Sequence, residues 1–213
     1  MKYPDLLRFL FPPVCVVCDK YAYYFCADCQ DKIDFLYFRP KLPLLEGLVD
    51  ELYVLGFYTP PLSTVIKALK YQSLYPIGNL LGDLLHQHLQ LPTNLDGITA
   101  VPLHPKRQRQ RGYNQAELIA KQLANRLNLP YQNLLIRQHH NRNLASTDNH
   151  QQRLTIMANA FTINPTQQAA ILGQNILIVD DVITTGSTLA TCATQLKQAG
   201  ANKILAVTLA HEG

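Results

Sequence analysis

The 213-residue sequence has no tryptophan, and it has few glycines (10) and few charged residues (16%). Its 47% hydrophobic content excludes a disordered chain, and its low glycine and proline counts exclude a fibrous one. It also lacks an apolar run of the roughly 18–20 residues that a membrane-spanning helix needs. The N-terminal apolar patch carries Asp5 and Arg8 and has no small-residue A-x-A cleavage site. We therefore expect no secretory signal and a cytoplasmic location.

Four of the five cysteines form two pairs, Cys15-x-x-Cys18 and Cys26-x-x-Cys29. Four thiolates in two such turns can surround one Zn²⁺ as a tetrahedron, with Zn–S distances of about 2.3 Å. Two disulfides or incidental cysteines are the alternatives, and a reducing cytoplasm disfavours disulfides. Protein sulfurs fill every coordination position, so we predict a structural zinc that folds a small module. Cys192 stands alone in a helical pattern and is expected to be a buried small residue.

Composition changes near residues 40–60, because thirteen of the eighteen Phe and Tyr residues precede residue 59. The proline-containing segment 39–43 resembles a linker. We predict a four-cysteine zinc-ribbon module at 1–45 and a larger domain at 46–213. Three tyrosines of the module are expected to form its small core, with stacking on nucleic-acid bases as the alternative: Tyr21, Tyr23 and Tyr24.

The larger domain alternates apolar strands with amphipathic helices. Strands are expected at 51–58, 98–103, 134–137, 176–179 and 203–209. Helices are expected at 62–70, 77–89, 115–129 and 187–199. Strands separated by helices of this length indicate an α/β fold with a parallel sheet and right-handed crossovers. The uninterrupted apolar run at 176–179 is typical of a strand covered on both faces.

Positive charge is concentrated in one part of the chain. Residues 101–160 contain nine Lys and Arg against two Asp and Glu, whereas 1–100 contain eight against ten. The densest group is Lys106, Arg107, Arg109 and Arg111. A solvated surface is the simple interpretation of such a run, but this density favours binding of an anionic group such as phosphate.

The most informative segment is 176–188, ILIVDDVITTGST. A buried strand leads to two carboxylates, Asp180 and Asp181, at the sheet edge where open α/β folds bind ligands. A turn rich in hydroxyl groups follows and enters a helix, whose first N–H groups can hold a phosphate while Gly186 allows close approach of the backbone. The carboxylates suit sugar hydroxyls or a divalent cation bound to a diphosphate. The segment therefore predicts a site for a phosphorylated sugar, with an acidic cap on a strand–turn–helix as the alternative.

All thirteen positions of this segment resemble the signature of type I phosphoribosyltransferases, which bind 5-phosphoribosyl 1-diphosphate (PRPP). Together with the four-cysteine ribbon, the chain resembles the narrower ComF family (competence protein F, with ComFC-like and GntX-like members), which is linked to natural transformation. The segment containing Lys67, Lys70 and Tyr71 resembles the family's Lys-x-x-Lys-Tyr motif, and 101–105 followed by 111–116 resembles its central motif.

This resemblance implies a Rossmann-like parallel sheet with helices on both faces and a PRPP site that uses Mg²⁺. Asp180 and Asp181 would contact the ribose hydroxyls with Mg²⁺, and the basic stretch would face the diphosphate. The predicted catalytic residues are Asp180, Asp181, Arg107 and Arg111. The predicted substrate-binding residues are Lys67, Lys70, Tyr71, Pro102, Arg109, Tyr113, Asn114, Thr184, Thr185, Gly186, Ser187 and Thr188.

One region departs from the family pattern. Ile156 stands where the family usually has Asn, and Ala145 and Asp148 stand near its usual Gln and Leu. The resemblance therefore does not assign the acceptor substrate.

Three hypotheses follow from these patterns. The first is a phosphoribosyltransferase associated with DNA uptake. The second is a non-catalytic module that binds PRPP and single-stranded DNA. In the third, the ribbon docks a helicase-like partner.

Overall fold

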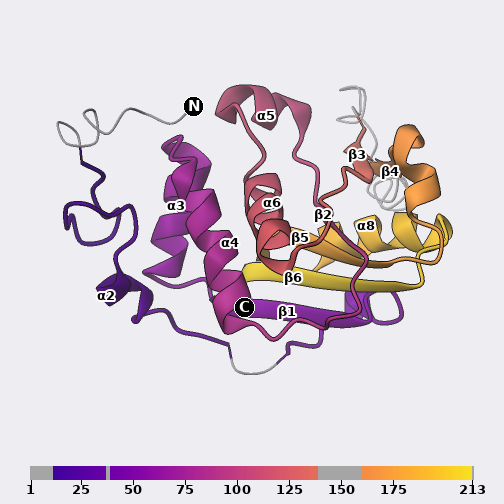
Figure 1. Cartoon of the computed structure of the whole chain (residues 1–213), viewed down its shortest axis with the longest axis horizontal. Coiled ribbons are helices and arrows are strands. Elements are labelled where there is room, and N and C mark those ends of the chain that lie inside the picture. The colour runs from indigo at the N-terminus through magenta and orange to yellow at the C-terminus, as the bar shows by residue number, and fades with distance from the viewer. Residues whose placement is uncertain (1–11, 37–38, 139–159, 213) are drawn as a thin grey trace, which may run out of the picture.

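The computed structural model describes residues 12–36, 39–138 and 160–212. Its main sheet has four parallel strands in the order β1-β6-β5-β2 (Figure 1). The strands are β1 (Glu51–Phe57), β2 (Gly97–Ala100), β5 (Asn175–Ile183) and β6 (Lys203–His211). The two central strands are almost wholly buried, as the apolar runs predict. The predicted parallel α/β sheet is confirmed.

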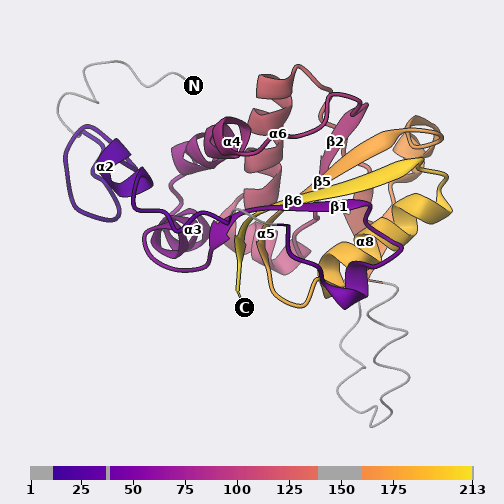
Figure 2. The ribbon, with the colours of Figure 1, turned by 90° about the horizontal axis from the view of Figure 1, so that it is seen from below.

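Helices cover both faces of this sheet. The longer helices are α3 (Leu62–Tyr71), α4 (Pro76–His88), α6 (Gln115–Leu127) and α8 (Ser187–Gln198). Helices α3, α4 and α6 pack on the face that carries Leu177 and Val179, whereas α8 packs on the face that carries Ile176 and Ile178. Figure 2 shows the strands between α4 and α6 on one side and α8 on the other. Cys192 of α8 is fully buried, as predicted.

Strand β5 continues past the predicted end at residue 179. Its neighbour β6 pairs with it as far as Ile183, whereas β2 stops at Ala100, opposite Val179. Asp180 and Asp181 therefore lie inside a strand, just beyond the last residue of β2, instead of after the strand end. Strand β2 is shorter than predicted: the strand expected at 98–103 ends at Ala100.

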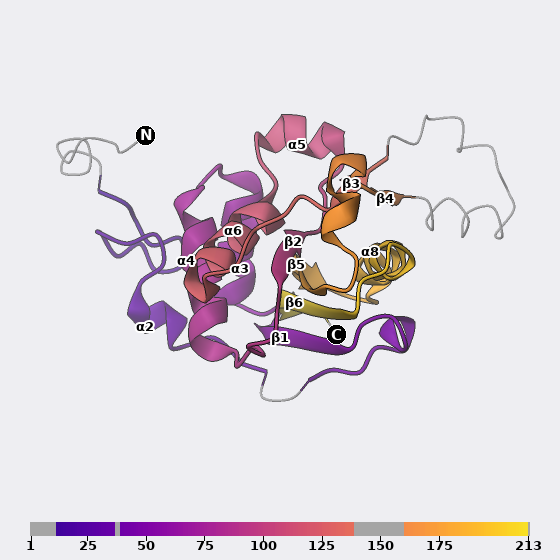
Figure 3. The ribbon, with the colours of Figure 1, turned by 45° about the vertical axis from the view of Figure 1, so that its right-hand side comes forward.

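The predicted strand 134–137 is present as β3 (Leu135–Arg137), but its place in a second sheet was not predicted, and neither was helix α5 (Pro105–Arg111). Helix α5 forms from a basic stretch that has no apolar stripe, and Gly112 ends it with a positive φ of 81°. Strand β3 pairs antiparallel with β4 (Phe161–Ile163) in a separate two-stranded sheet. Figures 1 and 3 show α5 standing off the main sheet, between the α3 and α6 side and the β3–β4 pair. The described residues also form two 3-10 helices, η1 (Pro43–Leu45) and η2 (Pro165–Ala170).

The N-terminal segment packs on the larger domain. Its short helix α2 (Ala27–Gln30) follows Cys26, and Leu36 N–H donates to the carbonyl of Leu55 in β1. Phe25 and three of the cysteines belong to the same buried cluster as α3 and α4. The division at residue 45 stays a prediction.

Two of the three tyrosines predicted as the core of the N-terminal segment are exposed, whereas Tyr24 is half-buried and packs against the hydrophobic core. Tyr21 is 70% exposed and Tyr23 is 51% exposed, so their prediction as core residues is wrong. Phe25, only 2% exposed, fills that role. The difference arises because the larger domain supplies the apolar surface against which this segment packs.

Within the described ranges, no helix combines the length and the apolar character needed to cross a membrane.

Candidate functional site

Asp181 is held from two sides by neighbouring helices. Its Oδ2 atom lies 3.1 Å from Nζ of Lys70 in α3. The same oxygen accepts a hydrogen bond of 2.8 Å from Nε2 of Gln115, the first residue of α6. Asp181 is only 6% exposed, so this carboxylate is desolvated and compensated by one cation and one amide.

Asp180 has different surroundings. Successive residues of a strand point to opposite faces, and Asp180 faces the side of α8 and β3. Its Oδ1 accepts a hydrogen bond of 2.8 Å from the backbone N–H of Asp181. Burial, and next the negative charge of Asp181, raise the pKa of Asp180 above its usual range, although the charges of Lys70 and Arg137 act in the opposite direction. The two carboxylates are adjacent in sequence but are not an equivalent pair.

The turn after β5 exposes hydroxyl groups beside a helix N-terminus. Thr184 and Thr185 are exposed. Thr185 Oγ1 accepts a long hydrogen bond of 3.4 Å from the backbone N–H of Ser187. Ser187 begins the 12-residue helix α8, and Thr188 lies in its first turn. Hydroxyl donors and the free N–H groups of a helix start are together suited to a phosphate.

Gly186 is required by the backbone of the turn, and its predicted close approach to a ligand stays a prediction. Its φ is +82°, a left-handed conformation. A Cβ atom at this position would lie 3.1 Å from Cγ of Leu45 and 3.4 Å from Cδ1 of Leu42. The turn therefore packs against the segment that contains η1, which fixes where α8 begins.

We expect Gly186→Ala to lower the free energy of unfolding by about 1–2 kcal/mol from the left-handed backbone alone. Contact with Leu45 adds to that loss. Gly173 also has a positive φ of 73° but nothing within 4 Å of its Cβ position, so Gly173→Ala is the matched control. Urea denaturation of both variants measures the difference. A smaller loss for Gly186→Ala than for the control would contradict the packing at this turn.

A cationic cavity lies between the end of α3 and helix α5. Its volume is about 360 Å³, and its lining consists of Lys70, Tyr71, Ser73, Arg107, Gln110 and Arg111. The lining contains three cations and no acidic residue. The Arg111 guanidinium lies 5.2 Å from the centre of the Tyr71 ring. The cavity thus brings together two segments that the sequence analysis selected separately, and Lys70 connects it to Asp181.

Three other predicted residues lie outside this lining. Lys67 is exposed, with Nζ 5.8 Å from the centre of the Tyr58 ring. Arg109 is exposed on α5, and Pro102 is half-buried in the segment between β2 and α5. The loop 184–188 is also not part of the lining.

Tyr113 and Asn114 form hydrogen bonds within the protein. Tyr113 is 8% exposed, and its hydroxyl donates to the backbone carbonyl of Leu69. The Asn114 side chain accepts from the N–H of Ala116 at 3.1 Å, which caps α6, and donates to the carbonyl of Val101 at 2.9 Å. Both residues fix the connection between α5 and α6.

Two residues of the site were not selected from the sequence. Gln115 contacts Asp181 but is uncharged, and only its place in the motif 111–116 pointed toward it. Arg137 lies in the short strand β3, with its guanidinium 5.0 Å from the centre of the Phe161 ring, and its charge acts on Asp180. No sequence pattern connects position 137 with position 180. The unusual Ile156, Ala145 and Asp148 lie outside the described residues.

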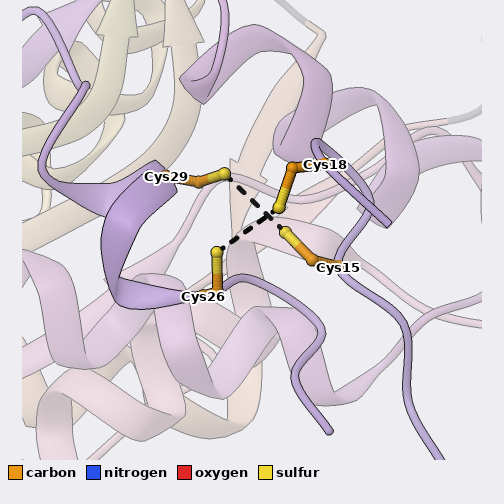
Figure 4. Close-up of side chains that lie close together, drawn as sticks. All are labelled: Cys15, Cys18, Cys26 and Cys29. Carbon is orange, nitrogen blue, oxygen red and sulfur yellow. Dashed lines mark hydrogen bonds between the residues drawn. The ribbon is translucent and has the colours of Figure 1, made fainter. Parts of the chain in front are cut away.

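The four paired cysteines form a compact cluster (Figure 4). Their four sulfur atoms lie within 4.8 Å of one another, with Cys15 and Cys29 sulfurs 4.0 Å apart and Cys18 and Cys26 sulfurs 3.6 Å apart. A tetrahedron with Zn–S distances of about 2.3 Å has S–S edges of about 3.8 Å. Figure 4 shows the four side chains pointing toward one another, two of them from the α2 region. The cluster fits a metal ion such as zinc.

The pKa values of the clustered thiols shift in opposite directions, with that of Cys15 lowered and that of Cys29 raised by burial. Burial acts to raise the pKa of Cys15 as well, but backbone N–H groups of Cys26, Val17 and Cys18 outweigh that effect and lower it to about 6. The thiolate is the form that binds a metal.

Residues 114–213 match the phosphoribosyl transferase domain family. The chain is 33% identical over 168 residues to competence protein F of Haemophilus influenzae, covering 73% of this chain and 70% of that protein. It is 34% identical over 157 residues to the DNA utilization protein YhgH of Escherichia coli K12, covering 68% of this chain and 64% of that protein.

Two solved structures show weaker similarity. The allosteric regulatory enzyme of purine biosynthesis is 21% identical, with a TM-score of 0.46 over 62% of this chain and 25% of that chain. A purine phosphoribosyltransferase from Pyrococcus horikoshii is 17% identical, with a TM-score of 0.35 over 67% of this chain and 75% of that chain.

Proposed function

Because the chain belongs to the competence protein F family and carries a phosphoribosyl transferase domain, we propose that it binds PRPP. The observation that carries this proposal is the position of Lys70. This residue lines the cationic cavity and also forms an ion pair with Asp181 of β5, which leads into the hydroxyl-rich turn. A group of cations and a carboxylate are thus adjacent, which supports a ligand that has both a diphosphate and ribose hydroxyls.

In the proposed complex, each part of PRPP has its own partners. The 5-phosphate lies at the 184–188 turn and the start of α8. The ribose hydroxyls donate to Asp180 and Asp181, and the diphosphate lies in the cationic cavity with Arg107 and Arg111. Mg²⁺ bound with PRPP would reduce the charge of the diphosphate, and carboxylate oxygens are the protein ligands that suit it.

The proposed reaction is phosphoribosyl transfer. An acceptor nucleophile forms a bond to the anomeric carbon while the bond from that carbon to the diphosphate oxygen breaks, and the electron pair leaves with the diphosphate. The protein contributes positioning and stabilisation of the negative charge on the leaving group. Arg107 and Arg111 are the residues proposed to supply the positive charge that stabilises the departing diphosphate.

Competition binding tests whether the two ends of PRPP, the 5-phosphate and the diphosphate, bind to these different parts of one site. Radiolabelled PRPP with Mg²⁺ is equilibrated with the zinc-loaded protein, and ribose 5-phosphate or pyrophosphate is added. We expect each fragment to displace PRPP, because each occupies part of the same site. Displacement by neither fragment, or no binding of PRPP, would contradict the proposal. Release of pyrophosphate with candidate acceptors then distinguishes an enzyme from a binding module.

A non-catalytic module that also binds single-stranded DNA is the second candidate function. One observation favours it: Tyr71 is 73% exposed and Tyr75 is 51% exposed beside the cationic helix α5. Tyr71 lies under Arg111, and the Tyr75 ring centre is 4.6 Å from that of Tyr113. Exposed aromatic rings next to cations are suited to base stacking and phosphate binding along a single strand.

DNA binding at this surface should depend strongly on salt. If the four cations of α5 contact phosphates, the affinity for an oligonucleotide falls roughly 20- to 50-fold between 50 and 200 mM salt. Tyr71→Ala should weaken binding about tenfold or more through lost stacking. Fluorescence anisotropy with a labelled single strand measures both effects, and Tyr131→Ala, in the segment that follows α6 and bridges to Ile98 of β2, is the aromatic control. Absent binding, or an affinity that does not change with salt, would reject this function.

We further propose that the four-cysteine cluster holds structural Zn²⁺ and that the protein acts in the cytoplasm. The sulfur geometry supports the zinc site. Thiolates that bind a metal persist in a reducing compartment, which favours the cytoplasm.

A further inference from the structure

Gln115 connects two parts of the candidate site through one side-chain amide. Its Nε2 atom donates to Oδ2 of Asp181 at 2.8 Å, and its Oε1 atom accepts from Nη1 of Arg111 at 3.0 Å. Gln115 is 6% exposed. Both ends of a buried amide are therefore used, one toward β5 and the other toward the cationic cavity.

The hydrogen-bonded chain begins and ends in the same cavity. It runs from Arg111 through Gln115 to Asp181, and from Asp181 to Lys70 by the ion pair of 3.1 Å. Both terminal cations line the 360 Å³ cavity. A carboxylate in the sheet and two cations in the cavity wall are thus fixed in relation to one another by the amide of Gln115.

A carboxamide satisfies both neighbours of position 115. It donates to a carboxylate and accepts from a guanidinium without adding charge. A glutamate would accept from Arg111 but would repel Asp181, and a methionine would fill the same volume while leaving both partners without the bond. Arginine also has a long, flexible side chain, so a fixed acceptor reduces the entropy it loses when an anion binds.

We propose that Gln115 is a positioning residue that couples Arg111 to Asp181, so that the diphosphate and the ribose of one ligand are bound together. The identity of that ligand as PRPP rests on the proposed function; the coupling itself does not.

The same helix offers a matched control. Gln122 of α6 donates from Nε2 to Oδ1 of Asp83 at 2.7 Å, and Arg126 also binds Asp83, at 2.7 Å from Nε. The residue types are those of the site, but this cluster joins α6 to α4 outside the cavity. Gln122→Met therefore removes a similar amide–carboxylate bond without touching the cavity.

The first test measures the coupling without any ligand. Urea unfolding of the zinc-loaded protein is compared for Arg111→Ala, Asp181→Asn and the double variant, in the wild-type and Gln115→Met backgrounds. With Gln115 present, we expect the two substitutions to be coupled by about fivefold in the unfolding equilibrium constant. With Gln115→Met the coupling should disappear. Coupling that is absent in the wild type, or that persists without the amide, would overturn the inference.

The second test measures PRPP affinity by calorimetry with Mg²⁺. Gln115→Met and Gln115→Glu should weaken binding about tenfold, and Gln122→Met should not change it. Gln115→Asn keeps the amide on a side chain that is one methylene shorter. It replaces the methionine variant if that variant does not fold. Wild-type affinity in all Gln115 variants would overturn the inference. A wild-type protein that shows the coupling but binds no PRPP would refute the proposed function and support the positioning role of Gln115.

Discussion

Chelation of the metal from the four-cysteine cluster is expected to lower the midpoint of thermal unfolding by at least about 10 °C. The reason is that Cys15, Cys26 and Cys29 are buried in the same hydrophobic cluster as α3 and α4. Without the metal, four sulfur atoms within 4.8 Å of one another lose the ion that holds them together. The segment 12–36 would then unfold and expose apolar surface of the larger domain to water.

Variants separate the metal's effect from ordinary core packing. Cys29→Ser should lose bound zinc, as measured by elemental analysis, and should show the lowered midpoint without any chelator. Cys192→Ala is the control, because Cys192 is equally buried but lies on α8. It should retain one zinc per chain. A Cys29→Ser protein as stable as the wild type, or a purified protein without metal, would show that the cluster is not a structural zinc site.

The Arg107→Ala/Arg111→Ala double variant is expected to weaken PRPP binding about 100-fold or more. Each guanidinium is proposed to donate charge-assisted hydrogen bonds to the diphosphate, and both line the cationic cavity. Calorimetric titration with PRPP and Mg²⁺ measures the dissociation constant. Affinity for ribose 5-phosphate should change little, because that ligand has no diphosphate.

Arg126→Ala is the matched control for this variant. Arg126 is also a cation of the central basic region, but it is bound to Asp83 on the α4 side of α6. Its removal should leave PRPP affinity unchanged within about twofold. A double variant that binds PRPP as the wild type does would place the diphosphate outside the cationic cavity.

The regular elements were predictable where hydrophobic periodicity is strong. The apolar run 176–179 and the stripes of α3, α4, α6 and α8 correspond to observed elements, with ends shifted by a few residues. Helix α5 was missed because six of its seven residues are polar or charged and its stability depends on end signals such as Gly112. The continuation of β5 was missed because its pairing with β6 is a non-local property.

Some residues of the candidate site could be selected from the sequence, but the contacts that connect them could not. The two segments that form the cationic cavity could be selected from the sequence, because Lys70 belongs to a recognisable motif and Arg111 to the dense group of cations. The roles of Gln115 and Arg137 depend on which strands and helices meet at Asp180 and Asp181, and no spacing along the chain encodes that. Alternation along β5 also separates the two carboxylates, which a motif written as a string presents as a pair.

Calorimetric titration of the wild type and of Asp180→Ala with PRPP and Mg²⁺ tests most directly whether the β5 carboxylates and the following turn bind a phosphorylated sugar. The account predicts one PRPP per wild-type chain and an affinity at least about tenfold lower in the variant, through lost bonds to the ribose hydroxyls. The absence of binding in the wild type, or equal affinity in both proteins, would contradict it.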